Sequence, residues 1–298
     1  MTRPVVAVLG PDGPRLVDPD EPVVTVDDLG LTRGDGCFDS ALVIDDGTKG
    51  GGPHHVVRDL AAHLDRLRRS AAALDIEPPS DDAWRALADC ALGSWATPGD
   101  ASLKLVLTRG REWVPAAGPT AFAVVTARAA GRAQRGAGGV TEPSRAVTLT
   151  RGHPSDAFGD APWLLGGVKT LSYVVNVAAQ REAARRGADD VIFTTTDGYA
   201  LDAPTAGLLV VRRGRWLSTP TEGTGILGSV SVATILEAAA ADGQEIAYEL
   251  VPVEHLHDAD GVWLVASSRG PTPVGEIDGQ PIRVDPDLVS LAARYAGF

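Results

Sequence analysis

The chain has 298 residues, of which 44% are apolar, and it carries a formal net charge of −12. This length predicts one large domain or two moderate ones, with enough apolar side chains for a core. The acidic balance argues against a nucleic-acid or anionic-membrane partner, and no apolar run is long enough to predict a membrane span. Only two cysteines occur, Cys37 and Cys90, so we expect a cytoplasmic protein without disulfides or a metal site. The first residues, broken by Pro and Gly, are not typical of a signal peptide.

The first half of the chain alternates short apolar runs with two helix-like segments. Leu60, Leu64 and Leu67 recur at helical spacing, which indicates an amphipathic helix. We expect strands over residues 4–10, 22–27, 38–47, 101–110 and 121–129, and helices over 54–76 and 80–95. This pattern predicts a sheet with two helices packed on it.

The second half begins after a stretch rich in small residues and Arg. Residues 127–139 show no apolar period and predict an interdomain linker, with a long surface loop as the alternative. Beyond it we expect helices over 174–186 and 228–243, strands over 189–196 and 260–268, and a hairpin over 208–219 that turns at Arg213–Gly214.

Lys169 is the only lysine between residues 140 and 190, and two glycines precede it closely. The commoner interpretation of such a lysine is a solvated surface charge. The alternative is a buried, neutral amine that forms a Schiff base. Tyr173 follows four residues later, which is about one helical turn if this segment is helical. Its phenol would then contact a ligand beside the lysine, although ordinary packing also explains it.

Two Gly- and Ser-rich turns predict binding of an anion. Ser231 lies at the start of the helix expected over 228–243, where free N–H groups and the helix dipole favour phosphate. Ser267 lies in a second such turn, after a strand. Arg66, on the first helix, would supply a charge if it pointed inward. Plain helix capping and a solvated Arg are the alternatives.

Six motifs occur in an order that resembles the class IV pyridoxal-phosphate enzymes. These are RGDGCF (33–38), HLDRLRRSA (63–71), VKTLSYVVNVAAQREAARRGADD (168–190), DGYALDAPTAGLLVV (197–211), GILGSVSVATILE (225–237) and TPVGEIDG (272–279). The family contains branched-chain aminotransferases, D-amino-acid aminotransferases and 4-amino-4-deoxychorismate lyases. The resemblance implies an α+β, two-domain fold type IV. A smaller N-terminal α/β sandwich would span 1–126, and a larger β-barrel-like, cofactor-binding domain with helices would span 140–298.

The resemblance also implies a role for individual residues toward pyridoxal 5'-phosphate. Lys169 matches the Schiff-base lysine, Tyr173 the tyrosine near the pyridine 3-oxygen, Arg66 the phosphate-binding arginine, and Val230 with Ser231 the pair at the start of a helix that holds the phosphate; Ser267 matches the second phosphate turn. Asp202 stands where the family has a glutamate that pairs with the pyridine nitrogen. Gly207 and Ser172 replace asparagines of the family pattern, so fine contacts to the cofactor differ.

The motif residues that we expect to face the substrate favour a lyase. The segment RGDGCF resembles the lyases more than the branched-chain enzymes, and we expect Phe38 and Ser40 to face the substrate. Val114 and Ala116 replace the Arg and His that bind a carboxylate in D-amino-acid enzymes, although some lyases also carry that Arg. Arg109 and Arg111 lie nearby and are candidates to substitute for it.

The resemblance therefore implies a 4-amino-4-deoxychorismate lyase that releases pyruvate and forms 4-aminobenzoate in folate biosynthesis. An aminotransferase for branched-chain or D-amino acids is the alternative, because the lysine segment is common to both. A cofactor-free binding protein on this fold is a third hypothesis, motivated by the altered motifs. The family further implies a homodimer acting on a small molecule.

Overall fold

The computed structural model describes residues 2–47, 54–128 and 142–298, which form two compact units. The first unit comprises Met1–Ala129 together with Val168–Ser172, and the second comprises Ala130–Gly167 and Tyr173–Phe298. Each combines helices with a sheet, as the sequence predicts. The linker expected at 127–139 lies, beyond its first two residues, outside the described residues. The segment around Lys169 groups with the first unit and not with the residues that flank it.

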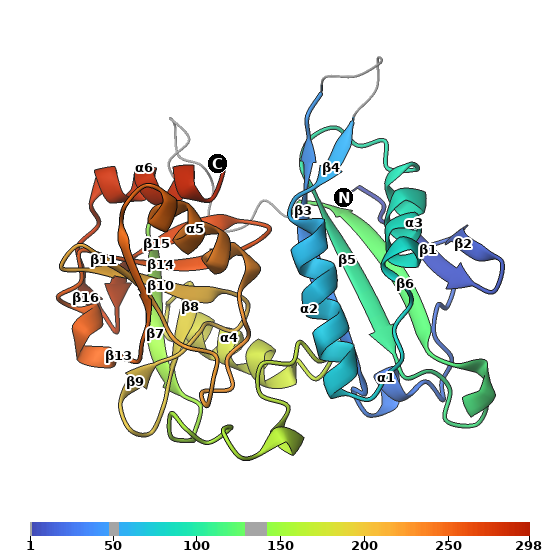
Figure 1. Ribbon diagram of the computed structural model, residues 1–298, viewed down its shortest axis with the longest axis horizontal. Coiled ribbons are helices and arrows are strands. Elements are labelled where there is room, and N and C mark those ends of the chain that lie inside the picture. Colours follow the sequence, from blue (N-terminus) through green and yellow to red (C-terminus); the bar gives the residue numbers. More distant parts are fainter. Residues whose placement is uncertain (1, 48–53, 129–141) are drawn as a thin grey trace. The chain divides into compact units, whose positions relative to one another are not determined.

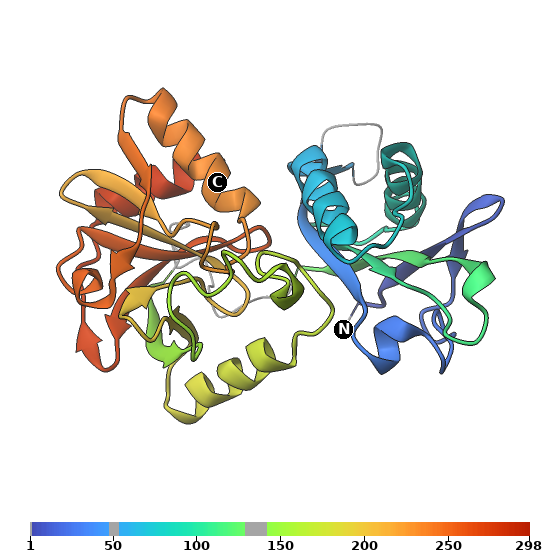
Figure 2. The same ribbon diagram turned by 60° about the horizontal axis from the view of Figure 1, so that its bottom comes forward.

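The first unit is built on a six-stranded antiparallel sheet (Figure 1). Its strands, in spatial order, are β2 (Gly13–Val17), β1 (Val5–Gly10), β6 (Thr120–Ala127), β5 (Ala101–Thr108), β3 (Gly36–Asp45) and β4 (His55–Val57). Helices α2 (Leu60–Ala73) and α3 (Asp81–Leu92) lie side by side on one face of it (Figure 2). Alternate residues of the strands face these helices and form the core with Leu64, Leu67, Trp84 and Leu87. The short helix α1 (Leu29–Thr32) precedes β3.

Two predicted elements of this unit are wrong. Residues 22–27 form turns and not a strand, because Pro22 lacks an N–H and Thr25 accepts a hydrogen bond from the amide of Asp28. The helix expected from residue 54 begins only at Leu60. Asp59 has a left-handed φ of 52°, and His55–Val57 instead pairs with the end of β3 as strand β4.

The second unit contains a ten-stranded sheet with helices outside it. The strand order is β12 (Glu245–Tyr248), β11 (Arg215–Ser218), β10 (Gly207–Arg212), β14 (Gly261–Ala266), β15 (Gly270–Ile277), β7 (Ser144–Thr150), β8 (Asp190–Thr194), β9 (Tyr199–Ala200) and β13 (Val251–Pro252), with β16 (Gln280–Pro281) beside β15. Helices α4 (Val174–Arg185) and α5 (Val230–Ala241) each connect a parallel strand pair, and α6 (Pro286–Tyr295) closes the chain.

Both faces of this sheet are buried, which explains its continuous apolar runs. Leu208, Val210 and Leu264 point into one cluster, to which Ala146 and Ile192 of β7 and β8 also belong. The intervening residues of β10 and β14 pack against α5 and α6, and those of β7 and β8 pack against α4. The two halves of this sheet share one inner core, and each half has helices on its outer face. This is the curled, barrel-like arrangement that the sequence predicts.

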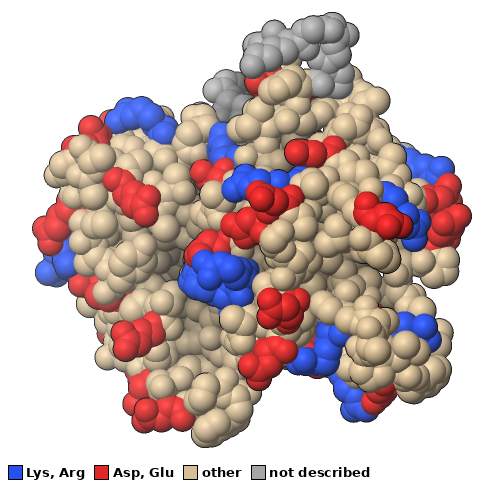
Figure 3. All heavy atoms as spheres, turned by 45° about the vertical axis from the view of Figure 1, so that its right-hand side comes forward, with Lys and Arg blue, Asp and Glu red and all other residues tan. Residues whose placement is uncertain are grey.

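The short sequence patterns of this unit predicted its hairpin turn and its helix cap correctly. The hairpin turns at Arg213 and Gly214, whose φ values of 52° and 76° are left-handed. Ser229 caps α5 by accepting a hydrogen bond from the amide of Val232. No helix within the described ranges is long and apolar enough to cross a membrane. On the face in Figure 3, acidic and basic side chains are interspersed.

Candidate cofactor and active site

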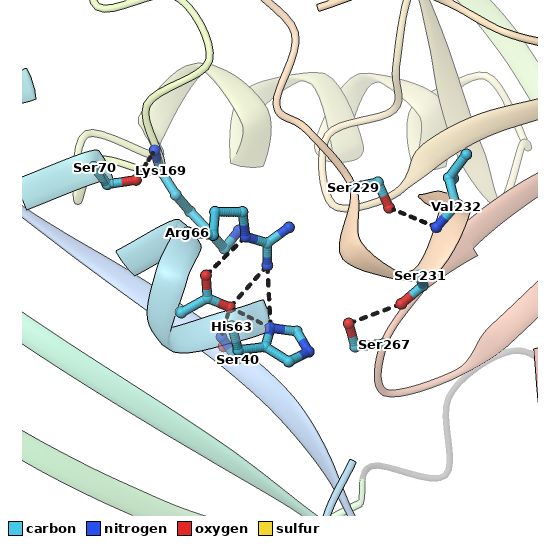
Figure 4. A network of polar contacts seen from close by, with 10 residues as sticks. Ser40, His63, Arg66, Ser70, Lys169, Ser229, Ser231, Val232 and Ser267 are labelled. Carbon is cyan, nitrogen blue, oxygen red and sulfur yellow. Dashed lines mark hydrogen bonds and ion pairs between the residues drawn. The ribbon is translucent and has the colours of Figure 1, made fainter. Parts of the chain in front are cut away.

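Lys169 is held on an extended segment beside β3. The amide of Phe38 donates to the carbonyl of Lys169 at 3.0 Å, and the amide of Leu171 donates to the carbonyl of Gly36 at 2.9 Å. The amide of Lys169 donates in turn to the hydroxyl of Ser70 on α2, at 3.2 Å (Figure 4). The backbone of the lysine is thus fixed by both the sheet and the helix of the first unit.

Two glycines of the RGDGCF motif make this approach sterically possible. A Cβ on Gly36 would lie 2.5 Å from the carbonyl oxygen of Leu107 and 2.7 Å from a methyl of Leu171. Gly34 has a φ of +69°, and a Cβ there would overlap the hydroxyl of Ser172. The motif therefore serves first to seat the segment that carries the lysine.

Lys169 and Tyr173 would lie one helical turn apart only if this segment were helical, and it is not. Residues 168–172 pair in an extended conformation, and α4 begins only at Val174, with Tyr173 as its N-cap residue. Hydrogen bonds to β3 replace the local bonds that a helix would need, so Lys169 and Tyr173 share no helical face. Tyr173 is half-buried and belongs to the second unit.

A second lysine reaches the same ring as Lys169. The Nζ of Lys169 lies 4.3 Å from the centre of the Phe38 ring, and the Nζ of Lys104 lies 5.3 Å from it. Ser40 is the partner of Lys104 in the register of β3 and β5. Phe38, Ser40 and Lys104 therefore lie on the sheet face away from the helices. Lys104 was not predicted as a site residue, although it is the one charged residue in the apolar alternation of β5.

Arg66 is buried and forms a network with Asp39 and His63 (Figure 4). Its Nε and Nη2 donate to the two carboxylate oxygens of Asp39 at 2.8 and 2.7 Å. The Nδ1 of His63 lies 2.7 Å from the same carboxylate. Burial alone raises the pKa of Asp39, but the hydrogen bonds and charges of Arg66 and His63 outweigh it and bring the pKa down to about 2.

Asp39 was missed as a site residue, although two signals pointed to it. His63 and Arg66 are three residues apart and share one face of α2, and Asp39 alternates with the core residues Cys37 and Ala41 on β3. Neighbouring Cys37 is fully buried. Its burial, with the charge of Asp39, raises the pKa of the thiol to about 12, so it is no nucleophile near neutral pH.

The predicted phosphate residues of the second unit meet at the start of α5. Val230 is the first residue of this helix. The hydroxyls of Ser231 and Ser267 lie 2.9 Å apart, although the two residues come from α5 and from the turn between β14 and β15 (Figure 4). A pair of hydroxyls beside the N–H groups of a helix start is a donor set that suits an anion.

Asp202 follows β9 and is half-buried, and its carbonyl accepts a hydrogen bond from the amide of Phe193 at 2.9 Å. Gly207, five residues later, begins β10 directly against α5. A Cβ at this position would lie 2.8 Å from atoms of both Ser229 and Val232. The glycine that replaces the family's asparagine is therefore fitted to close packing here.

The two arginines predicted near the substrate form ion pairs within the first unit. Arg109 donates to the carboxylate of Asp35 and to the carbonyls of Leu74 and Asp75. Arg111 pairs with the buried Asp27 at 3.1 Å. The carboxylate of Asp35 raises the pKa of Arg109. These contacts fix the loop after β5.

The amino-transferase class IV family model matches residues 36–277. The chain belongs to the class IV aminotransferases. It is 36% identical over 277 residues to a bifunctional aminodeoxychorismate lyase / D-amino acid transaminase of Mycobacterium tuberculosis, covering 89% of this chain and 90% of that protein. Its structure is similar to a fold IV transaminase from Curtobacterium pusillum (TM-score 0.84, 35% identity, 99% of both chains). It is also similar to a hypothetical aminotransferase from M. tuberculosis in an α-ketoglutarate- and PMP-bound form (TM-score 0.86, 33% identity, 98% and 97%).

Class IV aminotransferases are pyridoxal-phosphate enzymes, so the expected fold, cofactor and enzymatic nature are confirmed. The residues present fit this cofactor. The first unit offers an amine on a fixed backbone and a buried guanidinium, and the second offers paired hydroxyls at a helix start. These are the groups that an aldehyde and a phosphate require. Membership of this family sets aside the hypothesis of a cofactor-free binding protein.

Proposed function

We propose that the chain is a 4-amino-4-deoxychorismate lyase. The observation that carries the proposal is that the Nζ atoms of Lys169 and Lys104 both lie against the ring of Phe38. The substrate offers an amine and two carboxylates. Lys169 suits the chemistry at the amine-bearing carbon, and Lys104 suits a carboxylate.

Each residue then has a defined task. Pyridoxal phosphate would supply an electron sink for the carbon that bears the substrate's amine. Lys169 removes the proton from that carbon, C4. The C–O bond at C3 breaks, the departing enol takes up a proton to become pyruvate, and the ring becomes 4-aminobenzoate. Ser40, half-buried on the Phe38 face, is our candidate to deliver that proton.

The residues described above support the following cofactor-holding roles. We propose that Arg66, Ser231, Ser267 and the amide of Val230 hold the phosphate, that Tyr173 contacts the 3-oxygen, and that Asp202 keeps the ring nitrogen protonated. An Asp is one methylene shorter than the family's Glu, so it needs a closer backbone or a bridging water.

We place a substrate carboxylate at Lys104 and not at Arg109 or Arg111. Both arginines already donate to carboxylates of their own unit. Val114 and Ala116, both exposed, have no group that pairs with a carboxylate. This favours the lyase over D-amino-acid transamination.

Transamination of D- or branched-chain amino acids is the second candidate. It is favoured by the 36% identity to a relative whose name carries both the lyase and the D-amino acid transaminase activity. The deciding experiment incubates the holoenzyme with 4-amino-4-deoxychorismate and measures 4-aminobenzoate and pyruvate together. A panel of amino acids with 2-oxo acids runs in parallel. Equal release of both products supports the lyase, and turnover only in the panel replaces it with the second candidate.

We also propose that the enzyme is a homodimer in the cytoplasm. Val174 and Val175 at the start of α4 are 72% and 57% exposed, which is unusual for adjacent apolar side chains. Light scattering after gel filtration tests the dimer. A monomer mass at micromolar concentration overturns it.

A further inference from the structure

Asp39 holds the guanidinium of Arg66 along one edge. Its two carboxylate oxygens accept from Nε and Nη2, which is the side-on, bidentate arrangement (Figure 4). A guanidinium has five N–H donors in a fixed, planar fork. Asp39 takes the edge formed by Nε and Nη2, and Nη2 also lies 3.4 Å from Nδ1 of His63, so the guanidinium would meet an incoming anion with the edge that points away from Asp39.

The carboxylate is itself fixed in rotation. Asp39 is 1% exposed and Arg66 is 7% exposed, so both groups are removed from solvent. His63 contacts one oxygen of the carboxylate from the same helix as Arg66. Asp39 on β3 and His63 on α2 thus hold the guanidinium of Arg66 in one orientation.

We propose that Asp39 is a positioning residue that sets the orientation of Arg66 toward the phosphate of the cofactor. The inference rests on the proposed role of Arg66. Asp39 cannot strengthen the attraction for a phosphate by charge, because its negative charge offsets that of Arg66. Its contribution is therefore geometric, through a guanidinium that needs no reordering when the anion arrives.

The test compares the affinity for pyridoxal phosphate with the affinity for pyridoxal, which lacks the phosphate. Dissociation constants are measured by fluorescence titration for the wild type, Asp39→Asn and Arg66→Met. Asp39→Asn keeps the shape of the side chain but turns an amide N–H toward one donor of Arg66. We expect the constant for pyridoxal phosphate to rise about tenfold and that for pyridoxal to stay within about twofold.

Asp45→Asn is the matched control. It lies on the same strand, and its carboxylate accepts hydrogen bonds from the amides of Gly99 and Gly47, away from Arg66. It should lower stability without changing the preference for the phosphate. If Asp39→Asn proves too unstable to titrate, His63→Gln removes only the third contact, and it should reduce the same preference about two- to fivefold.

The outcomes separate the two proposals. If Arg66→Met abolishes the preference for the phosphorylated form and folded Asp39→Asn and His63→Gln retain it, the role of Asp39 is overturned and that of Arg66 stands. If Arg66→Met also leaves the preference unchanged, both roles fail. An equal loss of affinity for both ligands in Asp39→Asn also overturns the proposal, because that is the mark of general destabilisation.

Discussion

The Cβ that any other residue would place at Gly207 would lie 2.8 Å from the Cβ of Ser229. Real Cβ atoms essentially never come this close, so the first strand residue of β10 and the cap of α5 fit together only with glycine. The departure from the family's asparagine is thus coupled to the position of the helix start that carries Ser231.

Gly207→Asn, which restores the family residue, should destabilise this protein. The side chain must displace Ser229 and Val232, and such overpacking costs about 1–3 kcal/mol. We expect a lower thermal midpoint and weaker retention of pyridoxal phosphate. Gly214→Asn is the control, because Gly214 has a φ of +76° that Asn tolerates and no atom within 4 Å of its Cβ position. Equal midpoints for the two variants would contradict the packing argument.

Lys169→Ala should lose covalent attachment of the cofactor and nearly all turnover, by a factor on the order of 10³ or more. Borohydride treatment followed by peptide mass spectrometry measures the attachment directly. Thr170→Ala is the control, since the backbone pairing of Thr170 with Cys37 does not depend on its side chain. A borohydride-fixed cofactor on another lysine of the Lys169→Ala variant would show that the assignment is wrong.

Asp202→Asn should keep the covalently bound cofactor but slow removal of the substrate proton, by roughly tenfold or more. The neutral amide no longer favours a protonated ring nitrogen, so electron withdrawal weakens. Asp202→Glu, which restores the family's residue, should retain more activity than Asp202→Asn. Single-turnover kinetics with C4-deuterated substrate isolate this step. An unchanged rate in Asp202→Asn would assign the ring nitrogen to another residue.

Lys104→Met should raise KM for 4-amino-4-deoxychorismate by about ten- to a hundredfold and leave kcat within a few-fold. Methionine keeps most of the length of the side chain and removes the charge. Binding of the substrate carboxylate is therefore weakened, while Lys169 remains in place as the base. Steady-state kinetics at two salt concentrations measure the effect, since the wild-type KM should rise with salt and that of the variant should not. A fall in kcat alone would place Lys104 elsewhere in the mechanism.

The Asp39 network should make the first unit sensitive to acid. The pKa of Asp39 is lowered from 3.8 to about 2, so its contribution to stability is complete above pH 4 and is lost as the pH falls toward 2. The contribution is roughly 2 kcal/mol. Urea midpoints of the wild type and Asp39→Asn should therefore differ at pH 5 and converge near pH 2. A gap that is independent of pH would contradict the shift.

The sequence predicted the features that depend on residues close together in the chain. The hairpin at Arg213–Gly214, the cap of α5 and the helix that carries Arg66 follow from turn chemistry and period, and the ordered motifs predicted the fold and cofactor. It missed what depends on pairing between distant segments. Residues 168–171 lie beside β3, β4 closes the other end of that strand, and Asp39 meets Arg66 across 27 positions. No periodicity within one segment encodes such contacts.

The strand-like segment Val168–Ser172 has a consequence for how this chain can be divided. The chain leaves the second unit to complete the first and then returns. A fragment ending near residue 128 would lack this segment and expose the backbone of Gly36–Phe38 as an unpaired sheet edge, which invites aggregation. The reciprocal fragment would carry Lys169 without the strand that fixes it. The two units are thus poor candidates for separate expression. Because Lys169 and Arg66 both belong to the first unit, any rigid-body motion of that unit would carry them together.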